Sequence, residues 1–149
     1  MGTDTPADAG SRTIPHTGDL AIEAWAPDRE ECLAQALRGA VAAFAEIPPG
    51  LPRTARRTEL TAGDDAHLLV AALEEVIYRM DTTGEIPADV RVSPTASGPG
   101  PGEAVRLDLA MVDTSEVAQV GPVPKAVSWH ALHLGRGPTG WTCRVTLDV

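Results

Sequence analysis

Residues 125–149 constrain the fold more than any other part of the sequence. Residues 125–134 and 141–148 read as two strands, and the segment between them, GRGPTG, is rich in glycine. Strands joined by so short a loop pair with each other in antiparallel fashion. This hairpin argues against a doubly wound parallel sheet, in which a helix separates each pair of strands.

Two segments show the three- and four-residue spacing of apolar side chains that is typical of an amphipathic helix. The first begins after Asp28, which with Glu31 has the spacing of a capping box, and we expect it to run to about Glu46. The second begins after Asp64 or Asp65 and ends at an Asp-Thr-Thr-Gly sequence. The predicted core faces are Leu33, Leu37, Ala40, Val41 and Phe44 in the first helix, and Leu68, Leu69, Ala72, Leu73, Val76, Ile77 and Met80 in the second.

Four further segments indicate strands. Residues 20–26 and 104–111 alternate apolar and polar side chains, whereas residues 54–61 are mostly polar. Residues 86–92 contain Pro87, which favours an edge strand. The order of elements predicts an α+β fold, with two helices packed on a mixed or antiparallel sheet. Residues 93–103, SPTASGPGPGE, are expected to be a loop, and residues 112–124 a connection.

The length of 149 residues fits one domain. We expect residues 1–12 to be a disordered leader and residues 13–149 to form the single domain. The leader lacks the basic and apolar regions of a secretory signal, and no stretch of about 18 apolar residues could span a membrane. Cys32 and Cys143 belong to no Cys-x-x-Cys motif, so we expect free thiols in a reducing cytoplasm.

The net charge of −9 argues against direct, non-specific binding of nucleic acids, because the field of the protein repels phosphates. Arg53, Arg56 and Arg57 form the one basic cluster, which we expect to be solvated. A cation or a basic protein surface is a better match for the acidic balance.

Sequence motifs of catalysis are missing: there is no Gly-x-Ser-x-Gly, no phosphate-binding loop and no Gly-x-Gly-x-x-Gly. His130 and His133 have a spacing that would place them on opposite faces of a strand, which argues against a shared metal ion. His67 begins the second helix, where a solvated role is expected.

Carboxylates are the remaining candidates. Asp19 stands at the entrance of the first strand, and Asp148 is followed only by Val149, whose α-carboxylate would lie about one residue away. Three such groups would form an oxygen cage suited to Ca²⁺ or Mg²⁺. The structural alternative is an Asx turn at Asp19 and a solvated Asp148 at a frayed strand end.

Three segments, in this order along the chain, resemble the archease family. HTGDLAIEAWAPDREECLAQALRG is similar to its N-terminal signature, in which His-Thr-Ala/Ser-Asp precedes an apolar strand and a helix. LLVAALEEVIYRMDTTG is similar to its second helix, which ends in Asp-Thr/Ser-x-Gly. VPKAVSWHALHL and WTCRVTLDV are similar to its closing hairpin, which ends in Asp and an aliphatic residue. Gly18 departs from the usual Ala or Ser of the first motif, a change that loosens the turn.

The resemblance implies an α+β fold with strand-helix-strand-strand modules and a C-terminal β-hairpin. It implies an accessory protein rather than an enzyme: a cytoplasmic activator that helps an RtcB-type RNA ligase become guanylylated and turn over, in tRNA splicing or RNA repair. RNA would be met only indirectly, and no membrane would be involved. The family's metal site falls on Asp19, Asp148 and Val149, which would hold a divalent cation such as Ca²⁺, Mg²⁺ or Mn²⁺. His16 matches the motif's His, and with Thr17 it would fix these ligands by hydrogen bonds.

Two other functions stay open at this point. The same carboxylates could serve a stand-alone metal-dependent phosphoester hydrolase, although no base or nucleophile stands beside them in the sequence. The chain could also be a small-molecule-binding domain with a groove between helices and sheet.

Overall fold

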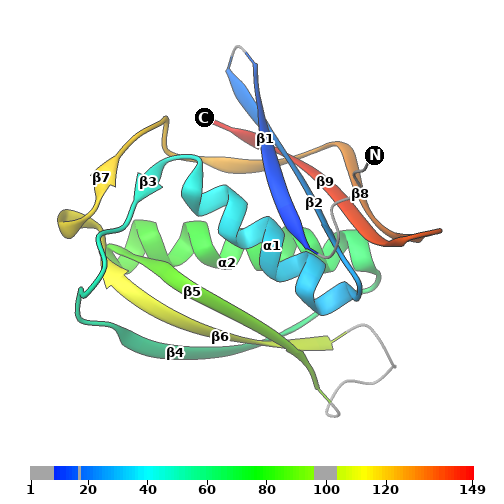
Figure 1. Cartoon of the computed structure of the whole chain (residues 1–149), viewed down its shortest axis with the longest axis horizontal. Coiled ribbons are helices and arrows are strands. Elements are labelled where there is room, and N and C mark those ends of the chain that lie inside the picture. The colour runs from blue at the N-terminus through cyan, green and yellow to red at the C-terminus, as the bar shows by residue number, and fades with distance from the viewer. Residues whose placement is uncertain (1–8, 17, 96–103) are drawn as a thin grey trace, which may run out of the picture.

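The computed structural model describes residues 9–16, 18–95 and 104–149, except for the side chain of His16. Helices α1 (Arg29–Ala42) and α2 (Asp65–Thr83) lie between two sheets (Figure 1). The four-stranded sheet has the order β1 (Gly10–His16), β2 (Asp19–Ala26), β9 (Gly140–Asp148) and β8 (Ala126–Gly137). The three-stranded sheet has the order β4 (Thr54–Thr61), β6 (Ala104–Asp113) and β5 (Glu85–Pro94). A 3-10 turn, η1 (Thr114–Glu116), and a short ladder of β3 (Ala45–Glu46) with β7 (Ala118–Gln119) complete the described elements.

The predicted α+β class, the two helices, the antiparallel pairing and the closing hairpin are confirmed. The strands divide between two main sheets, which the sequence did not show. The reason lies in the helices: α1 packs against β2 on one side and β5 on the other, and α2 packs against β8 and β5. Buried residues surround much of α1, so one sheet could not cover it.

Local signals set the helix starts. The Asp28 carboxylate accepts a hydrogen bond from the Glu31 N–H at 2.8 Å, and the Asp64 carboxylate accepts one from the His67 N–H at 2.8 Å. Helix α2 ends at Gly84, whose φ of 70° is the left-handed conformation expected of a C-terminal glycine. The predicted end of α1 near Glu46 is wrong: the helix stops at Ala42, because Ala45 and Glu46 pair with β7 instead.

The N-terminal boundary also differs from the prediction. Residues 1–8 lie outside the described residues, but residues 10–12, expected to belong to a disordered leader, are part of strand β1. This strand pairs with β2 along its whole length and forms the edge of the sheet. Because β1 is an edge strand whose described side chains are mostly exposed, and because it contains Pro15, its sequence lacks the alternation that marks a strand. The predicted edge position of β5 is confirmed, and of the predicted loop, residues 96–103 lie outside the described residues.

The hairpin is longer than predicted, since β8 continues to Gly137 and β9 starts at Gly140. The core between the sheets is aliphatic. Its largest fully buried side chains are Ile22, Leu33, Leu37, Leu68, Leu69, Leu73, Ile86, Leu107, Met111, Leu147, Val90 and Val105. No helix in the described part of the chain combines the length and the hydropathy that crossing a bilayer requires.

A candidate metal centre where β2 begins and β9 ends

Asp19 is the first residue of β2, and Asp148 is the last residue of β9. The antiparallel register places the two residues directly opposite each other. The next pair, Leu20 and Leu147, is buried toward the helices. Because side chains alternate along a strand, both carboxylates project from the face turned away from the helices.

The hydrogen-bond pattern brings these two carboxylates close. The Val149 N–H donates to the Gly18 carbonyl at 3.3 Å, which makes residues 18 and 149 a hydrogen-bonded pair. The neighbouring pair, Asp19 and Asp148, is therefore a non-hydrogen-bonded pair, the type in which side chains approach most closely. In such pairs the Cβ atoms lie about 4.5–5.5 Å apart. At this separation, the carboxylate oxygens of the two side chains can bind one cation between them.

The end of β9 is held on both sides. Val149 bonds to Gly18 on the β2 side, and the Lys125 N–H donates to the Asp148 carbonyl at 2.8 Å on the β8 side. Val149 itself is half-buried and packs against the core. Asp148 is thus an exposed side chain on an anchored backbone, which differs from the frayed end considered as the alternative.

Gly18 has a φ of 77°, in the left-handed region that favours glycine. The residue therefore suits the turn between β1 and β2, where the sequence comparison suggested only a loosening. His16 lies opposite Asp19 in the β1–β2 register, while its side chain and all of Thr17 lie outside the described residues.

A second carboxylate on the same sheet face shows how a half-buried charge is balanced here. Glu23 accepts hydrogen bonds from Arg12 Nε and from Arg144 Nη1, each at 2.6 Å. The hydrogen bond from Arg12 is the largest cause that holds the pKa of Glu23 below its usual range, and Arg144 adds to it. In contrast, Asp148 has no side-chain ion pair within the described residues. Directly opposed like charges are unfavourable unless a cation balances them.

The donor set fits a hard cation. Both side chains offer only carboxylate oxygens, the ligands that Ca²⁺ and Mg²⁺ prefer. Among the described residues, no three His, Cys, Asp or Glu side chains come close enough to hold a metal ion. A site built on Asp19 and Asp148 therefore needs a further oxygen donor.

Comparison with known proteins agrees with this arrangement of elements. Residues 12–149 match the model of the Archease protein family. The chain belongs to the archease family. It is 47% identical to "Probable protein archease" of Mycobacterium tuberculosis (strain CDC 1551 / Oshkosh) over 141 residues. The aligned region covers 95% of this chain and 75% of that protein. The same protein from strain H37Rv matches equally well.

Two solved structures share the archease fold. The solution structure of Methanobacterium thermoautotrophicum protein 1598 is 20% identical, with a TM-score of 0.73 over 94% of this chain and 99% of that one. The crystal structure of an archease from Thermotoga maritima, described as a possible chaperone, is 15% identical, with a TM-score of 0.62 over 100% and 99% of the two chains. At these identities the likeness concerns the fold.

The histidine pair considered from the sequence lies in an irregular part of this archease. The register of β8 against β9 shifts between Ser128 and His133, so His130 falls within a bulge rather than a regular strand. The alternation argument therefore does not apply there. The His130 N–H donates to Ser128 Oγ at 3.1 Å, and His133 Nε2 lies 3.3 Å from Thr142 Oγ1.

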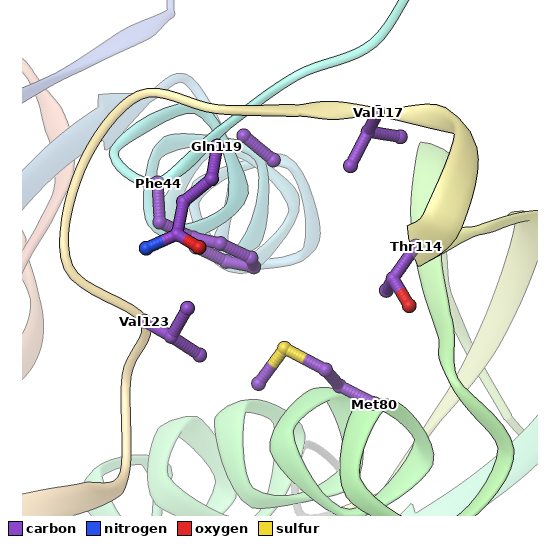
Figure 2. Close-up of a pocket in the computed structure, with 7 residues that line it drawn as sticks. Phe44, Met80, Thr114, Val117, Gln119 and Val123 are labelled. Carbon is purple, nitrogen blue, oxygen red and sulfur yellow. The ribbon is translucent and has the colours of Figure 1, made fainter.

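A groove for a small molecule was the other alternative, and an apolar pocket does occur (Figure 2). It has a volume of about 230 Å³ and lies among the ends of both helices and the segment that precedes β8. Figure 2 shows Met80 on α2 facing Phe44 and Val123 across the space. This volume is below the roughly 300–1,000 Å³ of typical ligand sites. Its lining residues are Phe44, Ala45, Met80, Thr114, Val117, Gln119 and Val123.

Proposed function

We propose that this archease is an accessory protein that activates an RtcB-type RNA ligase, promoting its guanylylation and multiple turnover in tRNA splicing or RNA repair. Membership of the archease family and the three motifs that resemble it support the proposal. The single observation that carries it is the non-hydrogen-bonded pair of Asp19 and Asp148. Within the proposal these two carboxylates and the α-carboxylate of Val149 hold a divalent cation (Ca²⁺, Mg²⁺ or Mn²⁺).

A bound divalent cation would supply positive charge where phosphate charge develops during nucleotidyl transfer. The protein itself would contribute by fixing the positions of the carboxylates that hold the cation. Asp19 sits on a strand paired on both sides, with β1 and β9, and Asp148 on a strand paired with β2 and β8. Ligands fixed by sheet backbone lose little entropy on binding, which favours a defined geometry.

The protein is proposed to be a helper rather than an enzyme. The cross-strand pair beside the carboxylates is Ala21 and Thr146, and both residues are buried. Neither of these two residues can act as the general base that a stand-alone phosphoester hydrolase would need next to its metal, and the side chain of His16, opposite Asp19, lies outside the described residues. We place the protein with its ligase in the cytoplasm, a reducing compartment that suits the free cysteines Cys32 and Cys143.

The proposal is tested by multiple-turnover RNA ligation with the cognate ligase, in the presence and absence of this protein. The intact protein is expected to stimulate turnover, and Asp148→Asn to lose most of that stimulation. Asp81→Asn, which removes an exposed carboxylate at the end of α2, is the matched control and should stimulate normally.

A variant with one glycine added after Val149 tests the α-carboxylate of Val149, because the added residue moves the carboxylate away from Asp19 and Asp148. This variant should also lose most of the stimulation. Equal stimulation by the intact protein and by Asp148→Asn would contradict the proposal that a metal ion at this site activates the ligase. Phosphatase or nuclease activity of the protein alone, lost in Asp148→Asn, would favour the hydrolase instead.

A further inference from the structure

The outer face of the three-stranded sheet carries an open depression with a volume of about 610 Å³. Its floor includes the cross-strand pair of Ala55 on β4 and Ala110 on β6, whose side chains are too short to fill the space. Residues of β6 that point to the other face of the sheet, such as Val105 and Leu107, are buried in the core. The charged residues that line the depression are Arg56, Arg57, Asp89, Arg91, Arg106 and Asp108.

Three arginines surround one carboxylate in this depression, and two of them bond to it. The strand register places Arg57 and Arg91 directly opposite Asp108, one on each side, from the two edge strands β4 and β5. Arg57 Nε donates to one oxygen of Asp108 at 2.9 Å, and Arg106 Nε donates to the other oxygen at 3.1 Å. The hydrogen bond from Arg57 is the largest cause that keeps the pKa of Asp108 below its usual range.

Arg91 is the one arginine of these three that bonds to no carboxylate within the described ranges. It is exposed and makes no side-chain hydrogen bond or ion pair within the described ranges. Both oxygens of Asp108 are already engaged by the other two arginines. The guanidinium donors of Arg91 are therefore available to a ligand.

The ion pairs of this face leave Arg91 out. Arg56 pairs with Glu85 at 3.3 Å, and Asp89 lies 3.9 Å from Arg38, which also pairs with Glu31 at 2.9 Å. Arg57 and Arg106 share Asp108, and Glu59 on β4 stands opposite Arg106. The depression therefore offers one unengaged guanidinium group beside two that are paired, rather than a large excess of positive charge.

We propose that this depression binds the phosphate groups of a small molecule. Guanidinium groups pair with phosphate through charge-assisted and often bidentate hydrogen bonds. Donors that approach from three neighbouring strands suit an anion with several oxygens and more than one negative charge. Because the depression lies on the other sheet from Asp19 and Asp148, this inference stands apart from the proposed activation of a ligase.

The test is a titration of the isotope-labelled protein alone, followed by NMR, with inorganic pyrophosphate and in parallel with a nucleoside triphosphate. We expect saturable shifts concentrated in β4, β5 and β6, which weaken as the salt concentration rises from about 20 mM to about 200 mM. Tighter binding of the triphosphate would indicate that the nucleoside also contributes, and equal binding that the phosphates suffice.

Arg91→Gln is expected to weaken binding about tenfold, the loss typical of one charge-assisted contact. Arg136→Gln, an exposed position on β8 with the same change of charge, should bind within about twofold of the unchanged protein. Equal weakening by both variants would show that overall charge alone attracts the anion, and would overturn the proposal. So would the absence of saturable shifts, or a poly-glutamate peptide binding as tightly as pyrophosphate, since the face would then dock acidic protein segments.

Discussion

Cys32 Sγ on α1 donates a hydrogen bond to the Ala24 carbonyl on β2 at 3.7 Å, beside Cys143, the residue opposite Ala24 on β9. The exposed fractions of Cys32 and Cys143 are 0% and 3%. The neighbouring Cys143 thiol, together with burial, raises the pKa of the Cys32 thiol far above its usual range. Because the thiolate is the reactive form, neither burial nor this pKa favours chemistry at Cys32 in the folded protein.

We therefore predict that the native protein resists thiol-modifying reagents. At neutral pH, a disulfide reagent should react with both cysteines within minutes in concentrated denaturant and far more slowly in buffer. Following the released chromophore gives both rates. Fast reaction of the native protein would contradict the buried contact.

Arg29 is a buried charge whose loss should destabilise the fold. Its side chain is 8% exposed and bridges the starts of both helices, with Asp65 at 2.9 Å and Glu30 at 2.8 Å. Breaking a buried pair from one side costs about 3–5 kcal/mol, and the partial exposure of both acids lowers that figure to about 2 kcal/mol.

Arg29→Ala should consequently lower the midpoint of thermal unfolding by about 4–8 °C, as judged by circular dichroism. Arg136→Ala, at an exposed position, serves as the control and should leave the midpoint nearly unchanged. A similar loss in both variants would mean that the bridge contributes nothing of its own.

Glu23 should make the stability depend on pH. Arg12 and Arg144 lower its pKa, so it stabilises the folded state above its ordinary value of 4.5, and this contribution is lost as pH falls through the lowered folded value. Glu23→Gln is expected to cost about 0.5–1 kcal/mol at pH 7, in line with a partly exposed ion-pair network.

The difference between the two proteins should shrink as the pH is lowered below 4.5, because the unchanged Glu23 then becomes neutral as well. Urea unfolding at pH 7 and at successively lower pH values measures it. A difference that stayed constant over this range would contradict the role assigned to the two arginines.

Calcium should stabilise the unchanged protein if the proposed centre binds it. A ligand at one hundred times its dissociation constant adds about 2.7 kcal/mol to the free energy of unfolding, which corresponds to a rise of about 5–10 °C in the melting midpoint. Asp148→Asn should abolish most of this rise, whereas Asp81→Asn should keep it. An equal rise in both variants would place the cation elsewhere.

Much of the local structure was readable from the sequence, because its causes lie within a few residues. Asp28 and Asp64 each cap a helix by accepting a hydrogen bond from the N–H three residues later. Gly84 ends α2 because only glycine adopts its left-handed conformation at little cost. The closing hairpin was predicted from two strand-like segments joined by a short glycine-rich loop.

Other features depend on contacts that no local pattern encodes. The end of α1 is set by the pairing of Ala45 with Gln119, and the division into two sheets by the two-sided burial of α1. The bulge in β8 and the pairing of β1 with β2 were also not visible in the sequence.

The two candidate sites show the same division. The closeness of Asp148 and Val149 follows from their being neighbours. Asp19 was a candidate from its place at the entrance of a strand, and the resemblance to archeases named the same three residues. Only the tertiary structure pairs β2 with β9 so that Asp19 stands opposite Asp148, and only the register of β4, β6 and β5 places Arg57 and Arg91 around Asp108. Backbone hydrogen bonds within a turn or helix are determined by adjacent residues, whereas the order and register of strands are decided by how the whole chain buries its apolar faces.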